Sequence, residues 1–101
     1  KPNDVSSVHG PVSQWDTSSV TTLKNLFRAH PRFDEPVGSW DVSRVADAEH
    51  AFEDTNFDRP LDAWDVAAVT SFRGMFRRSR HFDQKLSSWD VSSGRNMERM
   101  F

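Results

Sequence analysis

The stretch Leu61-Asp62-Ala63-Trp64-Asp65-Val66 decides the fold, because the chain writes the same pattern almost four times. Each copy contains a Trp-Asp pair, and a phenylalanine follows twelve residues after each tryptophan. The steps between successive tryptophans are 25, 24 and 25 residues. A repeat of this length is one structural unit that cannot bury its own apolar face, so the copies must stack on one another.

These distances divide the chain into an N-terminal extension, residues 1–7, and a single repeat domain, residues 8–101. The rungs cover about residues 8–32, 33–56, 57–81 and 82–101, and the last rung is incomplete. Stacked repeats need polar caps at their ends, and Phe101 is a core-type residue. We therefore expect either a segment of a longer protein or a last rung that rests on a partner.

Within each rung the apolar spacing changes from one period to another. Trp89 and Val91 alternate about Asp90, which is typical of a short strand. Val69, Phe72, Met75 and Phe76 then stand at i, i+3, i+6 and i+7, which indicates one face of a helix. The sequence therefore predicts an α/β fold, a repeat solenoid of about four rungs, each made of a short parallel strand, a helix and a loop.

Aromatic residues are expected to supply most of the core. The chain has eight phenylalanines and four tryptophans, and each such side chain buries roughly 150 to 250 Å². A second phenylalanine column follows the first in three rungs. The predicted structural core is Trp15, Trp40, Trp64, Trp89, Phe27, Phe52, Phe76, Phe101, Phe33, Phe57 and Phe82.

Charged side chains give an independent prediction of the register. Nine residues after each tryptophan stands a charged residue whose sign alternates from rung to rung: Lys24, Glu49, Arg73 and Glu98. Thirteen residues after the tryptophans the sign alternates in the same way, along Arg28, Glu53 and Arg77. Rungs stacked in register would turn these columns into ladders of opposite charge. Each exposed pair contributes only about 0.2 to 1 kcal/mol, so the ladders indicate register more than stability.

The recurring pattern L-x-x-W-D-V-S-x-V-x-x-M-x-x-M-F, followed by F-D-x-P-L, resembles the repeat of BspA-type leucine-rich-repeat surface proteins, which also occurs in mycoplasma surface lipoproteins of unknown function. The likeness is clearest from Leu86 to Ser92 with Met97 and Met100, and Gly94 departs from it by replacing a valine. The resemblance implies a leucine-rich-repeat-like solenoid and a role in surface attachment or protein–protein contact. It implies no shared enzymatic activity.

The aspartates beside the tryptophans are the first candidate site. Stacked in register, such carboxylates would lie about 5 Å apart and could bind Ca²⁺. Alternatively, each could accept backbone N–H bonds at a turn. A cation site usually draws ligands from more than one nearby position, so the sequence favours the structural role. The weak metal candidates are Asp16, Asp41, Asp65 and Asp90.

A cluster of basic residues in the third rung is the second candidate. Arg73 and Arg77 face acidic positions of the neighbouring rung, which can neutralise them. Arg78 and Arg80 have fewer such mates. The sequence therefore nominates Arg78, Arg80 and His81 as residues that contact a partner.

The chain contains no sequence motif typical of other classes of function. It has no cysteine, no G-x-S-x-G sequence and no glycine-rich phosphate loop, so we expect neither an enzyme nor a cofactor. A net charge of −2 argues against a nucleic-acid binder. No apolar run approaches the roughly 18 residues of a membrane span.

We therefore expect a non-catalytic protein–protein interaction or scaffold module, either in a surface protein or as a small accessory subunit of a larger assembly. The first alternative is a cell-surface adhesin that binds a glycan or a host protein, and the second is a Ca²⁺-stabilised repeat domain. The resemblance implies a location at the cell surface or outside the cell, and an organellar assembly is the other location considered.

Overall fold

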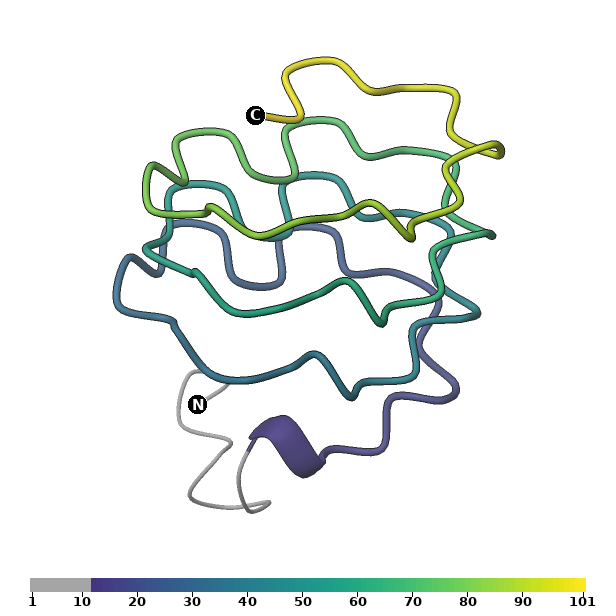
Figure 1. Ribbon diagram of the computed structural model, residues 1–101, viewed down its shortest axis with the longest axis horizontal. Coiled ribbons are helices and arrows are strands. Elements are labelled where there is room, and N and C mark those ends of the chain that lie inside the picture. Colours follow the sequence, from purple (N-terminus) through teal and green to yellow (C-terminus); the bar gives the residue numbers. More distant parts are fainter. Residues whose placement is uncertain (1–11) are drawn as a thin grey trace.

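The computed structural model describes residues 12–101 of the chain. The chain winds back over itself once per repeat, so that equivalent segments of successive repeats lie side by side (Figure 1). We call these repeats layers 1 to 4, formed by residues 12–32, 33–56, 57–81 and 82–101. The extension predicted at residues 1–7, and the start of the first rung, lie outside the described residues.

The predicted α/β solenoid is wrong. In residues 12–101 the only helical element is the short 3-10 helix η2, Val12–Gln14. Strand pairing in this part of the chain is limited to isolated parallel bridges. They join Thr22 to Asp47, Asp47 to Ser71 and Ser71 to Asn96. Neither the predicted strand at Trp89–Val91 nor the predicted helix over Val69–Phe76 is present, and the layers consist of turns.

Left-handed backbone conformations explain why the helix does not form. The residue ten positions after each tryptophan has a positive φ, and so does the residue fourteen positions after in layers 1 to 3. Gly74, in the middle of the predicted helix, has φ of 60°. An α-helix cannot continue through a left-handed residue, so each apolar stripe folds as consecutive turns. The residues are Asn25, His50, Gly74 and Arg99 in the first column, and Ala29, Asp54 and Arg78 in the second.

Backbone hydrogen bonds join the layers along these turns. The N–H groups of Leu23, Asn25 and Phe27 donate to carbonyls 24 residues later, with N···O distances of 2.8, 2.9 and 2.9 Å. The same pattern joins layer 2 to layer 3 and layer 3 to layer 4. We call the segments involved the ladder segments, residues 23–29, 48–54, 72–78 and 97–101. In every interlayer backbone–backbone hydrogen bond along them, the N–H belongs to the layer nearer layer 1 and the carbonyl to the following layer.

Aromatic rings stack from layer to layer beneath the ladder segments. The centroids of Phe27 and Phe52 are 5.5 Å apart, those of Phe52 and Phe76 5.6 Å, and those of Phe76 and Phe101 5.5 Å. Phe57 continues a second column between Phe33 and Phe82, at 5.8 and 6.1 Å. The ring stacks and the backbone hydrogen bonds join the same neighbouring layers, so both fix the same register.

The tryptophans bury their rings and satisfy their polar atom at the same time. The indole N–H groups of Trp40, Trp64 and Trp89 donate to the carbonyls of Val12, Val37 and Leu61, each in the preceding layer, at 2.9, 2.9 and 2.8 Å. Trp15 stands at the equivalent position of layer 1, and its buried Nε1 has no acceptor among the described residues. Each later layer is therefore tied to the one before it by an indole.

The expected core residues differ in how deeply they are buried. Most are buried, and Trp15, Phe33 and Phe82 are partly buried against the core cluster. Phe101 departs from the expectation, because its side chain is 72% exposed. Its ring stacks on Phe76, and no described layer covers its other face. The column position that is core in the inner layers is thus surface in layer 4.

Candidate interaction surfaces

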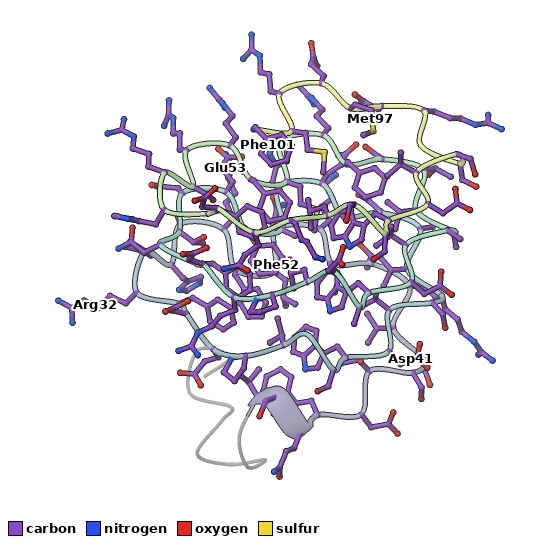
Figure 2. The ribbon with its side chains drawn as sticks, in the orientation of Figure 1. Arg32, Asp41, Phe52, Glu53, Met97 and Phe101 are labelled. Atoms are coloured by element: carbon purple, nitrogen blue, oxygen red, sulfur yellow. The ribbon has the colours of Figure 1, made fainter. Side chains whose placement is uncertain are left out.

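The aspartates beside the tryptophans complete the turns that follow them. Each carboxylate accepts the N–H of the residue two positions on, at 3.1, 3.0, 3.1 and 3.0 Å for Asp16, Asp41, Asp65 and Asp90. Figure 2 shows Asp41 at the edge of the stack opposite the labelled Glu53. All four side chains are therefore engaged in the local geometry that Asx turns provide.

Serine hydroxyls add a second hydrogen bond at two of these turns. Ser18 and Ser43 donate their Oγ–H groups to Asp16 and Asp41 at 2.7 and 2.6 Å. The hydrogen bonds from these hydroxyls have the largest effect on the pKa of both carboxyls and lower it below the ordinary value. The backbone N–H groups of the same serines lower the pKa further. Asp90 has a lowered pKa for the same two reasons, through Ser92. Charged carboxylates are thus stabilised by local donors.

A metal site would need more ligands than one aspartate of this column. Among residues 12–101, no three side chains of histidine, aspartate or glutamate are grouped so that they could hold a metal ion. The weak candidates Asp16, Asp41, Asp65 and Asp90 stand in separate layers, each bound to its own turn. The arrangement supports the structural role of the column.

These lowered pKa values predict an acid-sensitive fold. A carboxyl whose pKa is lower in the folded state stabilises the fold above its unfolded pKa, and the stabilisation is lost as the pH falls through the folded pKa. We expect the melting temperature to be constant near neutral pH and to fall below about pH 4. Substituting alanine for Ser18, Ser43 and Ser92 together should flatten this fall. Thermal melts from pH 7 to pH 2 test it, and an unchanged acid slope in the triple variant would contradict the assignment.

The buried carboxylate of Glu53 is the most enclosed charge in the described chain, with 3% of the residue exposed. His50 Nδ1 lies within hydrogen-bond distance of its Oε1. Arg28 Nε is 3.7 Å from Oε1, and Arg77 Nη1 is 3.6 Å from Oε2. Glu53 therefore binds cationic groups from layers 1 and 3 as well as the imidazole of its own layer.

The predicted charge ladders are confirmed at four ion pairs. Besides the two pairs of Glu53, Lys24 Nζ lies 3.9 Å from Glu49, and Arg73 Nε lies 3.1 Å from Glu98. Glu49 accepts from Ser71 Oγ at 2.7 Å, so the ladder between layers 2 and 3 uses a hydroxyl in place of Arg73. Alternating charge thus marks the observed register.

The basic residues nominated as partner contacts lie together on one exposed turn of layer 3. Arg78, Arg80 and His81 are all exposed. No ion pair joins Arg78 or Arg80 to an acidic side chain of residues 12–101, in contrast to Arg73 and Arg77. Two guanidinium groups, from residues two positions apart in the sequence, are therefore presented to solvent.

Ser79 anchors this turn from the inside. It is buried between the two exposed arginines, its hydroxyl donates to the Phe52 carbonyl of layer 2, and its N–H donates to the Phe76 carbonyl at 3.0 Å. Thr55 Oγ1 lies 3.4 Å from the same hydroxyl. A turn held at its centre directs both neighbouring side chains outward.

A second kind of surface lies at the two ends of the stack, and the sequence indicated it at Phe101 but missed it at Leu26. The exposed large apolar residues of the described chain are Leu26 in layer 1 and Val91, Met97 and Phe101 in layer 4. Figure 2 shows Met97 and Phe101 at the layer-4 end, with Phe52 in the interior. The pattern treats all copies of a position as equal, whereas exposure depends on the layer in which a copy lies.

No helix in the described part of the chain has the length and apolar character needed to cross a membrane.

Comparison with known protein families places the whole described chain within a family model. The family described as "Mycoplasma protein of unknown function, DUF285" matches residues 3–101. No curated protein matches the chain, and no solved structure matches it. The match covers all four layers, so it concerns the whole repeat domain.

Proposed function

Given that the chain belongs to the DUF285 family of Mycoplasma proteins of unknown function, we propose that it is a non-catalytic module that binds another protein. It would act within a surface protein of the BspA-like kind or as a small accessory subunit of a larger assembly. The observation that carries the proposal is the turn of Arg78, Ser79 and Arg80, in which a buried residue holds two exposed cations.

Fixed geometry makes this turn suited to recognition. Long charged side chains pay conformational entropy when they bind, and a rigid backbone removes the additional cost of ordering the loop. The Ser79 hydroxyl and N–H bind carbonyls of two different layers, so the turn is ordered before a partner arrives. Planar guanidinium groups bind carboxylates in pairs of hydrogen bonds. The expected partner surface is acidic.

The glycan alternative receives less support. Sugar-binding surfaces commonly use aromatic faces, and Trp40, Trp64 and Trp89 are buried and donate their indole N–H to backbone carbonyls of the preceding layer. Their faces stack on other rings of the core, as Trp64 does on Trp89 at 6.4 Å. The charged turn is therefore the better candidate surface, and it favours a protein partner.

A charge reversal on this turn tests the proposal. The double variant Arg78→Glu, Arg80→Glu should bind a fluorescent peptide of ten glutamates about tenfold more weakly than the wild-type chain, because two favourable pairs become repulsive. Fluorescence anisotropy at low ionic strength measures this, and added salt should weaken wild-type binding as well. The melting temperature should change little, because both side chains are exposed.

A matched control variant distinguishes binding by this turn from an effect of the net charge. Arg44 and Arg95 are exposed and lie in other layers, and Arg44→Glu with Arg95→Glu changes the net charge by the same amount. This control should keep most of the affinity. Equal losses in the two double variants would show unspecific attraction, and no binding by the wild-type chain would remove the Arg78–Arg80 turn as an acidic-partner surface.

A further inference from the structure

The carboxylate of Glu53 has more cationic neighbours than its single charge requires. Its Oε1 atom lies within hydrogen-bond distance of His50 Nδ1. The guanidinium groups of Arg28 and Arg77 approach it from layers 1 and 3. A buried carboxylate needs partners, because an unpaired buried charge is strongly destabilising. With His50 and Arg28 in place, Glu53 keeps such partners when the Arg77 side chain moves away.

The pair between Arg77 and Glu53 is looser than the pair that another arginine of layer 3 makes. Arg77 Nη1 lies 3.6 Å from Glu53 Oε2, which is longer than a hydrogen bond. By contrast, Arg73 Nε donates to Glu98 Oε1 at 3.1 Å. A guanidinium that donates to a carboxylate is bound more firmly than one that only lies near it. Arg77 is therefore the more easily released of the two arginines.

The backbone holds Arg77 at the start of the turn that carries the two exposed arginines. Its N–H donates to the Gly74 carbonyl at 3.1 Å, and its carbonyl accepts the Asp54 N–H at 2.9 Å. The side chain of Arg77 is 33% exposed, so part of it reaches solvent. The turn therefore carries a third guanidinium group on a fixed backbone, directly before Arg78 in the sequence.

We propose that Arg77 is a third arginine contact for the partner, and that its guanidinium exchanges Glu53 for a carboxylate of an acidic protein. This inference rests on the proposed function of the Arg78–Arg80 turn. In the unbound chain the charge of Glu53 attracts the guanidinium. On binding, the guanidinium turns to the partner, while His50 and Arg28 stay with Glu53. Glu53 is then a positioning residue that sets how strongly the turn attracts an acidic surface.

Two variants of layer 3 that change the net charge equally test the contact. Fluorescence anisotropy measures their binding to the peptide of ten glutamates. Arg77→Gln should weaken binding about threefold, because one contact with the peptide is lost. Arg73→Gln should change it little, because the guanidinium that it removes is bound to Glu98. Exposure alone would give the opposite order, since the side chain of Arg73 is 46% exposed and that of Arg77 is 33% exposed.

Removing the charge of Glu53 should have the opposite effect on binding. Glu53→Gln keeps the shape of the side chain but no longer attracts Arg77, so the peptide should bind about threefold more tightly. The control Glu49→Gln removes a carboxylate that faces Lys24 of the neighbouring layer, and it should raise the affinity less. In the Arg77→Gln background, Glu53→Gln should no longer raise the affinity. Each variant is measured below its own melting temperature.

The possible failures of this inference and of the proposed function differ. Equal binding by the wild-type chain and Arg77→Gln, or equal losses in Arg77→Gln and Arg73→Gln, would overturn the contact while leaving the roles of Arg78 and Arg80 intact. A gain in Glu53→Gln that persists without Arg77 would overturn the positioning role of Glu53. A wild-type chain that does not bind the peptide would overturn the proposed function and this inference together.

Discussion

Phe52→Ala should destabilise the fold by about 3–5 kcal/mol, as large-to-small changes at buried phenylalanines do. Its side chain is 1% exposed. The ring lies 5.5 Å from Phe27, 4.4 Å from Phe57 and 5.6 Å from Phe76, so it joins both phenylalanine columns across three layers. Small domains have total stabilities of about 5–15 kcal/mol, so the variant should be close to unfolding at room temperature.

Phe101→Ala is the matched control, because it removes the same side chain at the same repeat position in layer 4. With 72% of the residue exposed, little apolar area is lost and no cavity forms. Its effect should be below about 1 kcal/mol. Urea unfolding followed by tryptophan fluorescence measures both variants. Similar losses in both would show that burial within the column does not determine stability.

Gly74→Ala should destabilise the fold by about 2–4 kcal/mol through two separate effects. The backbone at Gly74 has φ of 60°, where a side chain is strained. A Cβ atom there would also lie 2.5 Å from Nδ1 and 2.8 Å from Cε1 of His50. The imidazole cannot move freely, because it binds the buried carboxylate of Glu53.

A second substitution separates strain from crowding. His50→Gly in the Gly74→Ala background removes the ring that the new methyl group meets and places glycine at another positive φ. The double variant should lose less stability than the sum of the single changes, which a double-mutant cycle by urea unfolding measures. Additive losses would show that the contact with His50 is unimportant.

Gly94→Ala serves as the reference for this series. Its Cβ would meet neighbours at 3.1 to 3.3 Å, and its φ lies outside the left-handed range. We expect a smaller loss than at Gly74. A loss as large as that of Gly74→Ala would remove the special role of the left-handed position.

The stacking could be predicted from the sequence because periodicity is independent of backbone conformation. The repeat of Trp64 and Phe76 requires equivalent side chains to meet, and the alternation from Lys24 to Glu49 requires neighbouring layers to be in register. Both follow from side-chain chemistry at a fixed spacing. Ion pairs and ring stacks between layers are observed at these positions.

The conformation within a layer could not be predicted in the same way. The spacing of Val69, Phe72, Met75 and Phe76 fits one face of a helix, but consecutive turns place the same residues in the core. In the first left-handed column only Gly74 and Asn25 are residue types that adopt positive φ routinely. His50 and Arg99 adopt it because stacking on the neighbouring layer compensates for the strain, and this compensation leaves no local signal.

The candidate surfaces also differ in how far the sequence could predict them. Arg78, Arg80 and His81 could be nominated because a charge without an opposite neighbour is visible in the sequence. The burial of the serine between the arginines and the exposure of Phe101 were not visible, because both depend on which layer lies next to a residue. The same phenylalanine column contains Phe52 in the interior and Phe101 at the surface.

The common direction of the ladder hydrogen bonds gives the ladder segments an electric polarity. Each peptide group carries a dipole, and in the ladder segments the interlayer N–H groups all point toward layer 4. The dipoles of successive layers therefore add, as they do in an α-helix, although no α-helix is present in residues 12–101. The N–H groups of Ala46, Thr70 and Arg95 donate to the preceding layer instead, so the polarity belongs to the ladder segments, whose positive pole lies in layer 4 and whose negative pole lies in layer 1.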